Sequence, residues 1–216
     1  IGGLGVITVG AALALLAGRK ISLKQRSTMQ EASAAPQMGG IVRLTGFILR
    51  ATLLFEAAGA VALMPVFCRD YGLRGIWMGM FHSISAFCNA GFDLLGTEQA
   101  PYVSLTAYAA DPLVSLVIAG LIVAGGLGFL TWEDIRTHRL DLRRYRMQSK
   151  VILATTGLLI LLPTVYFFFF EFTQGSIGQR FLLSLFQAIT PRTAGFNTAQ
   201  LAEMSGGPQS PMITLM

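Results

Sequence analysis

Two short segments combine alanine, glycine and phenylalanine in the same order. Ala90-Gly91-Phe92-Asp93 recurs as Ala194-Gly195-Phe196-Asn197, and each copy follows a short apolar run, at residues 75–87 and 181–190. Glycine permits backbone conformations that turn successive carbonyl groups toward one line. Rings of such carbonyls replace the hydration shell of a cation in channel filters. A single copy would suggest an ordinary outer turn, but two copies in equivalent places favour a cation filter.

Three further polar residues could act on a cation near these segments. Glu56 lies within an apolar stretch, where an ionisable group is costly and therefore a functional candidate. It could face a water-filled path, or it could stabilise a contact between helices. Asp93 and Asn197 each follow a glycine by two positions, where a carboxylate would attract cations, although salt screens the effect. Either could instead bond its own loop backbone. We favour the mouth role for Asp93 and the local bond for Asn197.

The composition places these segments in a membrane protein. Of 216 residues, 53% are hydrophobic and 12% are charged, and the mean hydropathy is +0.61. A soluble protein has about 25% charged residues, so soluble, disordered, collagen-like and disulfide-rich classes are excluded. The cysteines Cys68 and Cys88 cannot form a disulfide framework. His82 and His138 have no second ligand at metal spacing, so we expect no metal site apart from the cation path.

Four stretches approach the roughly 20 apolar residues that cross a hydrocarbon core about 30 Å thick. They are residues 1–18, 41–67, 112–131 and 151–172. The first begins without an initiator Met or a charged leader, so we interpret it as the later part of a helix. The short apolar runs cannot cross and are predicted to be re-entrant or interfacial. The sequence therefore predicts an all-α polytopic membrane protein.

Basic residues set the expected orientation. Most of them occupy two loops, at residues 19–43 and 132–150. Cytoplasmic loops carry an excess of Lys and Arg, so both loops are predicted to be cytoplasmic and the short apolar runs enter from outside. This placement explains the net charge of +5 without nucleic acid. The basic loops could also dock a cytosolic partner, which is the alternative to orientation alone.

A second repeated motif supports an internal repeat. Gly-Gly-Leu-Gly occurs at residues 2–5 and again at residues 125–128, each time near the end of a predicted span and before a basic loop. We interpret it as a close helix packing motif built on small residues. Each repeat unit begins and ends on the inside, so the units are parallel repeats about an axis along the membrane normal.

Longer stretches around the Ala-Gly-Phe segments resemble the KtrB/TrkH/HKT family of potassium transporters. Residues 81–93, Phe-His-Ser-Ile-Ser-Ala-Phe-Cys-Asn-Ala-Gly-Phe-Asp, resemble that family's second pore loop. Residues 187–197, Gln-Ala-Ile-Thr-Pro-Arg-Thr-Ala-Gly-Phe-Asn, resemble the third pore loop. Residues 1–5 resemble the inner end of the first repeat. The resemblance covers essentially the whole chain and is closest to the Ktr branch, with the TrkH type as the alternative.

The resemblance implies four linked repeats of helix, re-entrant pore loop and helix around one potassium path. It implies potassium uptake across the plasma membrane, with sodium as a stimulating or coupling ion and no covalent cofactor. It also implies a homodimer in contact with membrane lipids and with a cytosolic ring of the KtrA type, through which a nucleotide would regulate transport.

Filter residues follow from the resemblance by position, with Gly91 and Gly195 as the key glycines. The ten predicted filter residues are Cys88, Asn89, Ala90, Gly91, Phe92, Arg192, Thr193, Ala194, Gly195 and Phe196. Cys88 departs from the asparagine that the family often has and adds an oxidisable thiol.

The resemblance also predicts how the repeats divide the chain. Residues 1–40 contain the end of the first repeat and a cytoplasmic loop, residues 41–148 form the complete second repeat, and residues 149–216 form the third repeat up to its filter. We expect a fragment that does not form the whole pore by itself. An accessory membrane subunit without an ion path is therefore the competing hypothesis. No pairing of nucleophile and base suggests an enzyme.

Overall fold

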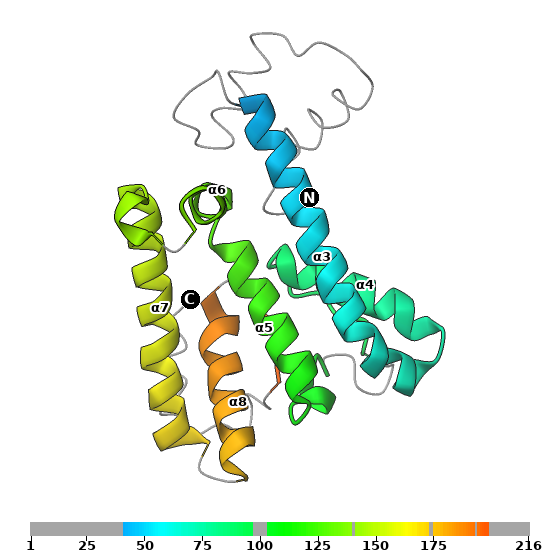
Figure 1. The fold of residues 1–216 in the computed structure, drawn as a ribbon. Helices are drawn as coiled ribbons and strands as arrows, with labels where there is room; N and C mark the ends of the chain where they lie inside the picture. The colour runs from blue at the N-terminus through cyan, green and yellow to red at the C-terminus, as the bar shows by residue number, and fades with distance from the viewer. Residues whose placement is uncertain (1–40, 97–102, 140, 173–174, 193, 199–216) are drawn as a thin grey trace. The chain divides into compact units, whose positions relative to one another are not determined.

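The computed structural model describes residues 41–96, 103–139, 141–172, 175–192 and 194–198 (Figure 1). Several predictions fall outside these residues: the span at 1–18, most of the basic loop 19–43, the first Gly-Gly-Leu-Gly copy, and Thr193. All regular structure in the described part is helical, which confirms the all-α prediction there. The chain divides after Phe55 into two compact units, and the packing contacts described lie within the second, Glu56–Met216.

Two long helices are apolar and long enough to cross a membrane. The helix α3 covers Ile41–Tyr71, and the helix α7 covers Met147–Tyr166 and continues as the π-helical turn η4, Phe167–Glu171. Their candidate spans are Gly46–Tyr71 and Met147–Glu171. These helices confirm the long helices predicted over residues 41–67 and 151–172.

The predicted span over residues 112–131 is bent rather than one straight helix, and it is a candidate span only if the two helices on either side of the bend are taken together. Helix α5 covers Pro112–Gly126, and helix α6 covers Phe129–His138 after a bend of 96°. Gly128 has φ of +78°, a conformation that glycine adopts at little cost, so the helix direction can change at this point. At about 1.5 Å per residue, α5 is roughly 22 Å long, which is shorter than the hydrocarbon core.

The start of α5 follows from local sequence. The carboxylate of Asp111 accepts hydrogen bonds from the backbone N–H groups of Leu113 and Val114, at 2.9 and 3.3 Å. Pro112 occupies the first helical position, where its missing N–H costs nothing. The N-cap and the proline together explain why the helix begins at this residue.

Two short helices occupy the apolar runs that precede the Ala-Gly-Phe segments. Helix α4 covers Arg74–Phe87, and helix α8 covers Ile177–Ile189 and is followed by the 3₁₀ turn η5, Thr190–Arg192. Their lengths confirm the prediction of short helices, and their re-entrant placement in a membrane stays a prediction. Ser176 and Gln179 form a reciprocal capping box at the start of α8.

Helices α4, α5, α8 and α7 pack as successive neighbours: α4 on α5, α5 on α8, and α8 on α7 (Figure 1). Glycine makes the first of these contacts possible. A β-carbon at Gly125 would lie 1.9 Å from the carbonyl oxygen of Phe87. The second Gly-Gly-Leu-Gly copy therefore packs against the end of α4, which confirms its interpretation as a packing motif.

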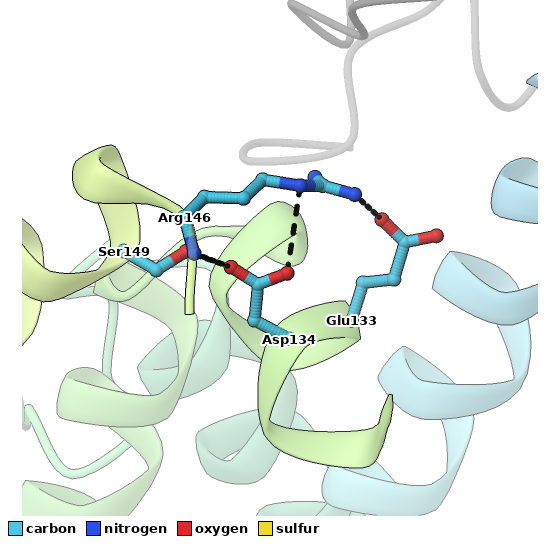
Figure 2. A network of polar contacts seen from close by, with 4 residues as sticks. All are labelled: Glu133, Asp134, Arg146 and Ser149. Atoms are coloured by element: carbon cyan, nitrogen blue, oxygen red, sulfur yellow. Dashed lines mark hydrogen bonds and ion pairs between the residues drawn. The ribbon is translucent and has the colours of Figure 1, made fainter. Parts of the chain in front are cut away.

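A polar network joins α6 to the beginning of α7 (Figure 2). Asp134 is 2% exposed and accepts hydrogen bonds from the backbone N–H of Arg146 at 3.0 Å and from Ser149 Oγ at 2.7 Å. The guanidinium of Arg146 also contacts Asp134 at 3.5 Å and Glu133 at 2.8 Å. Asp134 thus caps the first turn of α7 from a different helix, a role that a carboxylate near a helix N-terminus performs well.

Candidate cation filter

The predicted filter segments begin where α4 and η5 end, and an amide within each segment bonds back to that helix or turn. The N–H of Ala90 donates to the carbonyl of Ser85 at 2.9 Å, and the N–H of Gly195 donates to Thr190 at 3.2 Å. The carbonyls of four filter residues accept no hydrogen bond from the part of the chain that the structure describes. These residues are Ala90, Gly91, Ala194 and Gly195.

Both key glycines have a left-handed backbone. The φ angle is +72° at Gly91 and +76° at Gly195, and Asn89 also has a positive φ of +52°. Asparagine tolerates this region better than most residues, and glycine adopts it freely. The repeated glycine therefore has a specific backbone role in both segments, as the sequence predicted.

The structure brings the two segments into contact. A β-carbon built on Gly91 would lie 1.9 Å from the carbonyl oxygen of Ala194 and 3.4 Å from the carbonyl carbon of Gly195. Residues more than a hundred positions apart in the sequence therefore share one site, and the absence of a side chain at Gly91 allows it. The two loops that carry the repeated glycines therefore lie side by side.

Two hydroxyl groups hold the outer ends of the segments, and the sequence analysis missed both. Ser85 Oγ donates to the carbonyl of Phe92 at 2.8 Å, and Thr190 Oγ1 donates to the carbonyl of Phe196. Each hydroxyl thus donates to the carbonyl of the phenylalanine that directly follows the key glycine. Ser85 lies six positions before Gly91, whereas Thr190 lies five positions before Gly195. An alignment of the two copies without a gap therefore does not pair the two hydroxyl residues.

His82 also has an unpredicted role beside the candidate filter. It is fully buried, its Nδ1 lies 2.7 Å from the carbonyl oxygen of Met78, and its Nε2 lies 3.4 Å from the backbone nitrogen of Leu94. A carbonyl can only accept and a backbone N–H can only donate, so Nδ1 carries the proton and Nε2 accepts. The sequence predicted packing for His82, and the structure adds this bond to the chain just after Asp93.

Glu56 lies beside the first residue of the filter. The thiol of Cys88 donates to Glu56 Oε1 at 4.0 Å, and Ser83 Oγ donates to the main-chain carbonyl of Glu56 at 2.7 Å. The backbone of Glu56 therefore joins α3 to α4, while its carboxylate lies near the end of α4. No ion pair to Glu56 occurs among the residues that the structure describes.

The other predicted site residues have different environments. Asp93 Oδ1 accepts the backbone N–H of Leu95 at 3.0 Å, so Asp93 makes a local bond in its own loop. Phe92 is 69% exposed, whereas Phe196 is 1% exposed, so the two phenylalanines differ despite the repeat. Arg192 is partly buried in η5, and this burial lowers the pKa of its guanidinium.

The backbone of Asn197 bonds to the loop at residues 103–111. Its backbone N–H donates to Ser104 Oγ at 3.0 Å, and its carbonyl accepts the N–H of Leu105 at 2.9 Å. No group of three metal-binding side chains occurs within the described ranges.

Comparisons with known proteins agree with these features. The TrkH family, described as "Cation transport protein", matches residues 1–216. The potassium/sodium uptake protein NtpJ of Enterococcus hirae is 37% identical over 95% of the chain and 45% of its own length. The Ktr system potassium uptake protein B is 37% identical in Vibrio alginolyticus, over 100% of the chain and 48% of the relative. The Bacillus subtilis protein of that name is 34% identical over 96% and 46%.

The chain thus spans about half the length of these curated relatives. The family match nevertheless extends over every residue of the chain. The chain therefore belongs to the TrkH family of cation transport proteins, whose members are transporters and not enzymes.

Proposed function

We propose that the protein takes up potassium across the plasma membrane through a path lined by the backbone carbonyls of its two Ala-Gly-Phe segments. The observation that carries this proposal is the close contact between Gly91 and the carbonyl oxygen of Ala194, which brings the two segments together. The carbonyls of Ala90, Gly91, Ala194 and Gly195 accept no hydrogen bond from the described residues, whereas those of Phe92 and Phe196 do. The printed names of the relatives support potassium as the transported ion.

The proposed architecture consists of repeats of helix, re-entrant pore loop and helix. In this division residues 41–148 form one complete repeat, with α4 as its pore helix, and residues 149–216 begin the next, with α8 in the same role. Residues 1–40 contain the end of an earlier repeat. The segments enter from outside, and the basic loops 19–43 and 132–150 are cytoplasmic, because positive residues concentrate there.

Side chains at the two ends of the filter would raise the local concentration of cations. The Glu56 carboxylate lies next to Cys88, where the filter begins, and Asp93 follows the filter glycine. A negative charge close to a narrow path attracts cations and repels anions. In this proposal Asn197 contributes through its backbone, and Cys88, Asn89, Phe92, Arg192, Thr193 and Phe196 complete the filter segments.

Sodium and a cytosolic partner are further parts of the proposal. One relative is named a potassium/sodium uptake protein, which supports sodium as a stimulating or coupling ion. Others belong by name to a Ktr system, which supports additional subunits. We expect a homodimer that contacts a nucleotide-binding ring of the KtrA type at its cytoplasmic face.

Growth of a potassium-uptake-deficient bacterium on low potassium tests the proposed function. The protein is expressed from its complete gene, with and without a KtrA-type subunit, and as Gly91→Ser and Gly195→Ser variants. We expect rescue by the parent protein, and loss of rescue in both variants at equal membrane levels. A well-inserted parent protein that does not rescue growth would favour an accessory membrane subunit without an ion path.

A further inference from the structure

One outer loop, residues 103–111, bonds directly to the chain after Gly195 and reaches the chain after Gly91 through two intervening rings. On one side, Ser104 and Leu105 bond the backbone of Asn197, two positions after Gly195. Leu105 is fully buried, so this end of the loop is fixed by packing as well as by hydrogen bonds. Ser104 has a φ of +49°, an uncommon conformation for a serine.

On the other side, Tyr108 reaches the segment that follows Gly91 through two ring contacts. The Tyr108 ring packs edge-on against Phe67, with centroids 5.3 Å apart, and Phe67 stacks on His82 at 5.0 Å. His82 Nε2 in turn accepts the backbone N–H of Leu94. The loop thus supports the exits of both segments.

The loop itself is anchored at the end of α3 and at the start of α5. Tyr108 OH donates to Asp70 Oδ2 at 2.8 Å. Burial, and then the bond to Asp70, raise the pKa of Tyr108, so the phenol keeps its proton and remains a donor. Asp111 caps α5 at the far end of the loop. A loop held at both ends can act as a rigid support.

We propose that loop 103–111 is a brace that positions both filter segments, with Ser104 as a residue that sets the discrimination between potassium and sodium. This inference rests on the proposed function. A filter selects potassium when its carbonyls keep a defined spacing or field strength. Asn197 lies three positions after Ala194, whose carbonyl oxygen contacts Gly91. Loss of its bond to Ser104 would loosen that spacing without removing any filter residue.

The brace is tested with Ser104→Ala and with a matched control in the same loop, Thr106→Ala. Thr106 Oγ1 donates at 2.8 Å to the carbonyl of Val103, so the control removes a hydroxyl bond that stays within the loop. Uptake of potassium and of sodium is measured for the protein expressed from its complete gene. We expect Ser104→Ala to reduce the potassium-to-sodium preference roughly fivefold, as the loss of one hydrogen bond allows, and Thr106→Ala to leave it unchanged.

A second variant keeps the test decisive if Ser104→Ala does not reach the membrane. Ser104→Gly also removes the hydroxyl but suits the positive φ, so it should fold and show the same loss of preference. Unchanged preference in an inserted Ser104 variant overturns the brace while the parent protein still transports potassium. Equal losses in the Ser104 and Thr106 variants also overturn it. A parent protein that does not transport potassium overturns the proposed function, and the brace with it.

Discussion

The carbonyl oxygen of Ala194 occupies the position that a side chain on Gly91 would need. A β-carbon at Gly91 would lie 1.9 Å from that oxygen, closer than real β-carbons approach any heavy atom to which they are not bonded. At Gly195, by contrast, a β-carbon would meet no described atom within 4 Å, although the backbone is equally left-handed. The two glycines of the repeat are therefore required for different physical reasons.

Substitutions at the two glycines should consequently differ. Asparagine tolerates a positive φ, so Gly195→Asn should retain measurable potassium uptake, whereas Gly91→Asn should abolish it through the clash with Ala194. Gly195→Val should also fail, because a β-branched residue cannot adopt this backbone without strain. Potassium-dependent growth and membrane levels of the three variants check this order. Equal tolerance of asparagine at both positions would contradict it.

The two ring nitrogens of His82 make different contributions that two substitutions can separate. A glutamine amide can approach the position of Nε2, and an asparagine amide that of Nδ1. Because Nε2 holds Leu94 beside the filter, His82→Gln should keep more potassium affinity than His82→Asn. Half-saturation by potassium is the measurement. A higher potassium affinity in His82→Asn than in His82→Gln would mean that the bond to Met78 contributes more than the bond to Leu94.

Loss of the buried Asp134 carboxylate should destabilise the joint between α6 and α7. In Asp134→Ala, Ser149 Oγ and the N–H of Arg146 lose their acceptor, at an expected cost of about 1–3 kcal/mol in the free energy of unfolding. Arg144→Gln is the control, because its ion pair with Asp141 is exposed and contributes little. Thermal unfolding of the purified protein in detergent compares the two. A destabilisation that is no larger for Asp134→Ala would refute the capping role.

Neutralising Glu56 should weaken potassium uptake more than neutralising a carboxylate far from the filter. The Glu56 carboxylate lies beside Cys88, so Glu56→Gln removes a charge that attracts cations to the path. We expect a several-fold higher potassium concentration at half-maximal uptake. Glu133→Gln, which alters the network between α6 and α7, should leave this value unchanged. Identical values for both variants would assign Glu56 to helix contacts alone.

The sequence predicts the helices best where apolar length and hydropathy alone determine how long a helix is. Apolar length distinguishes the long α3 and α7 from the short α4 and α8, because only length and hydropathy are needed. The bend between α5 and α6 is different: residues 112–131 are apolar on both sides of Gly128, so neither hydropathy nor periodicity reveals a change of direction. The positive φ of Gly128 is a property of the fold.

The candidate site could likewise be predicted only in part from the sequence. Repetition identifies Gly91 and Gly195, because the backbone conformation itself demands glycine. The bonds from Ser85, Thr190 and His82 to the loop backbone could not be predicted, because each depends on how a helix end meets the chain that follows it. The contact between Ser104 and Asn197 joins residues 93 positions apart, and no local pattern indicates it.

The bonds between the loop at residues 103–111 and Asn197 mean that successive repeats do not evolve as independent units. In the proposed division the loop belongs to the repeat at residues 41–148, but it bonds Asn197 in the repeat that follows. After duplication, a change in one unit would thus have to be matched in its neighbour. A chimera that exchanges one repeat between relatives should function better when the crossover keeps residues 103–111 together with the Ala194-Gly195-Phe196 segment than when it separates them.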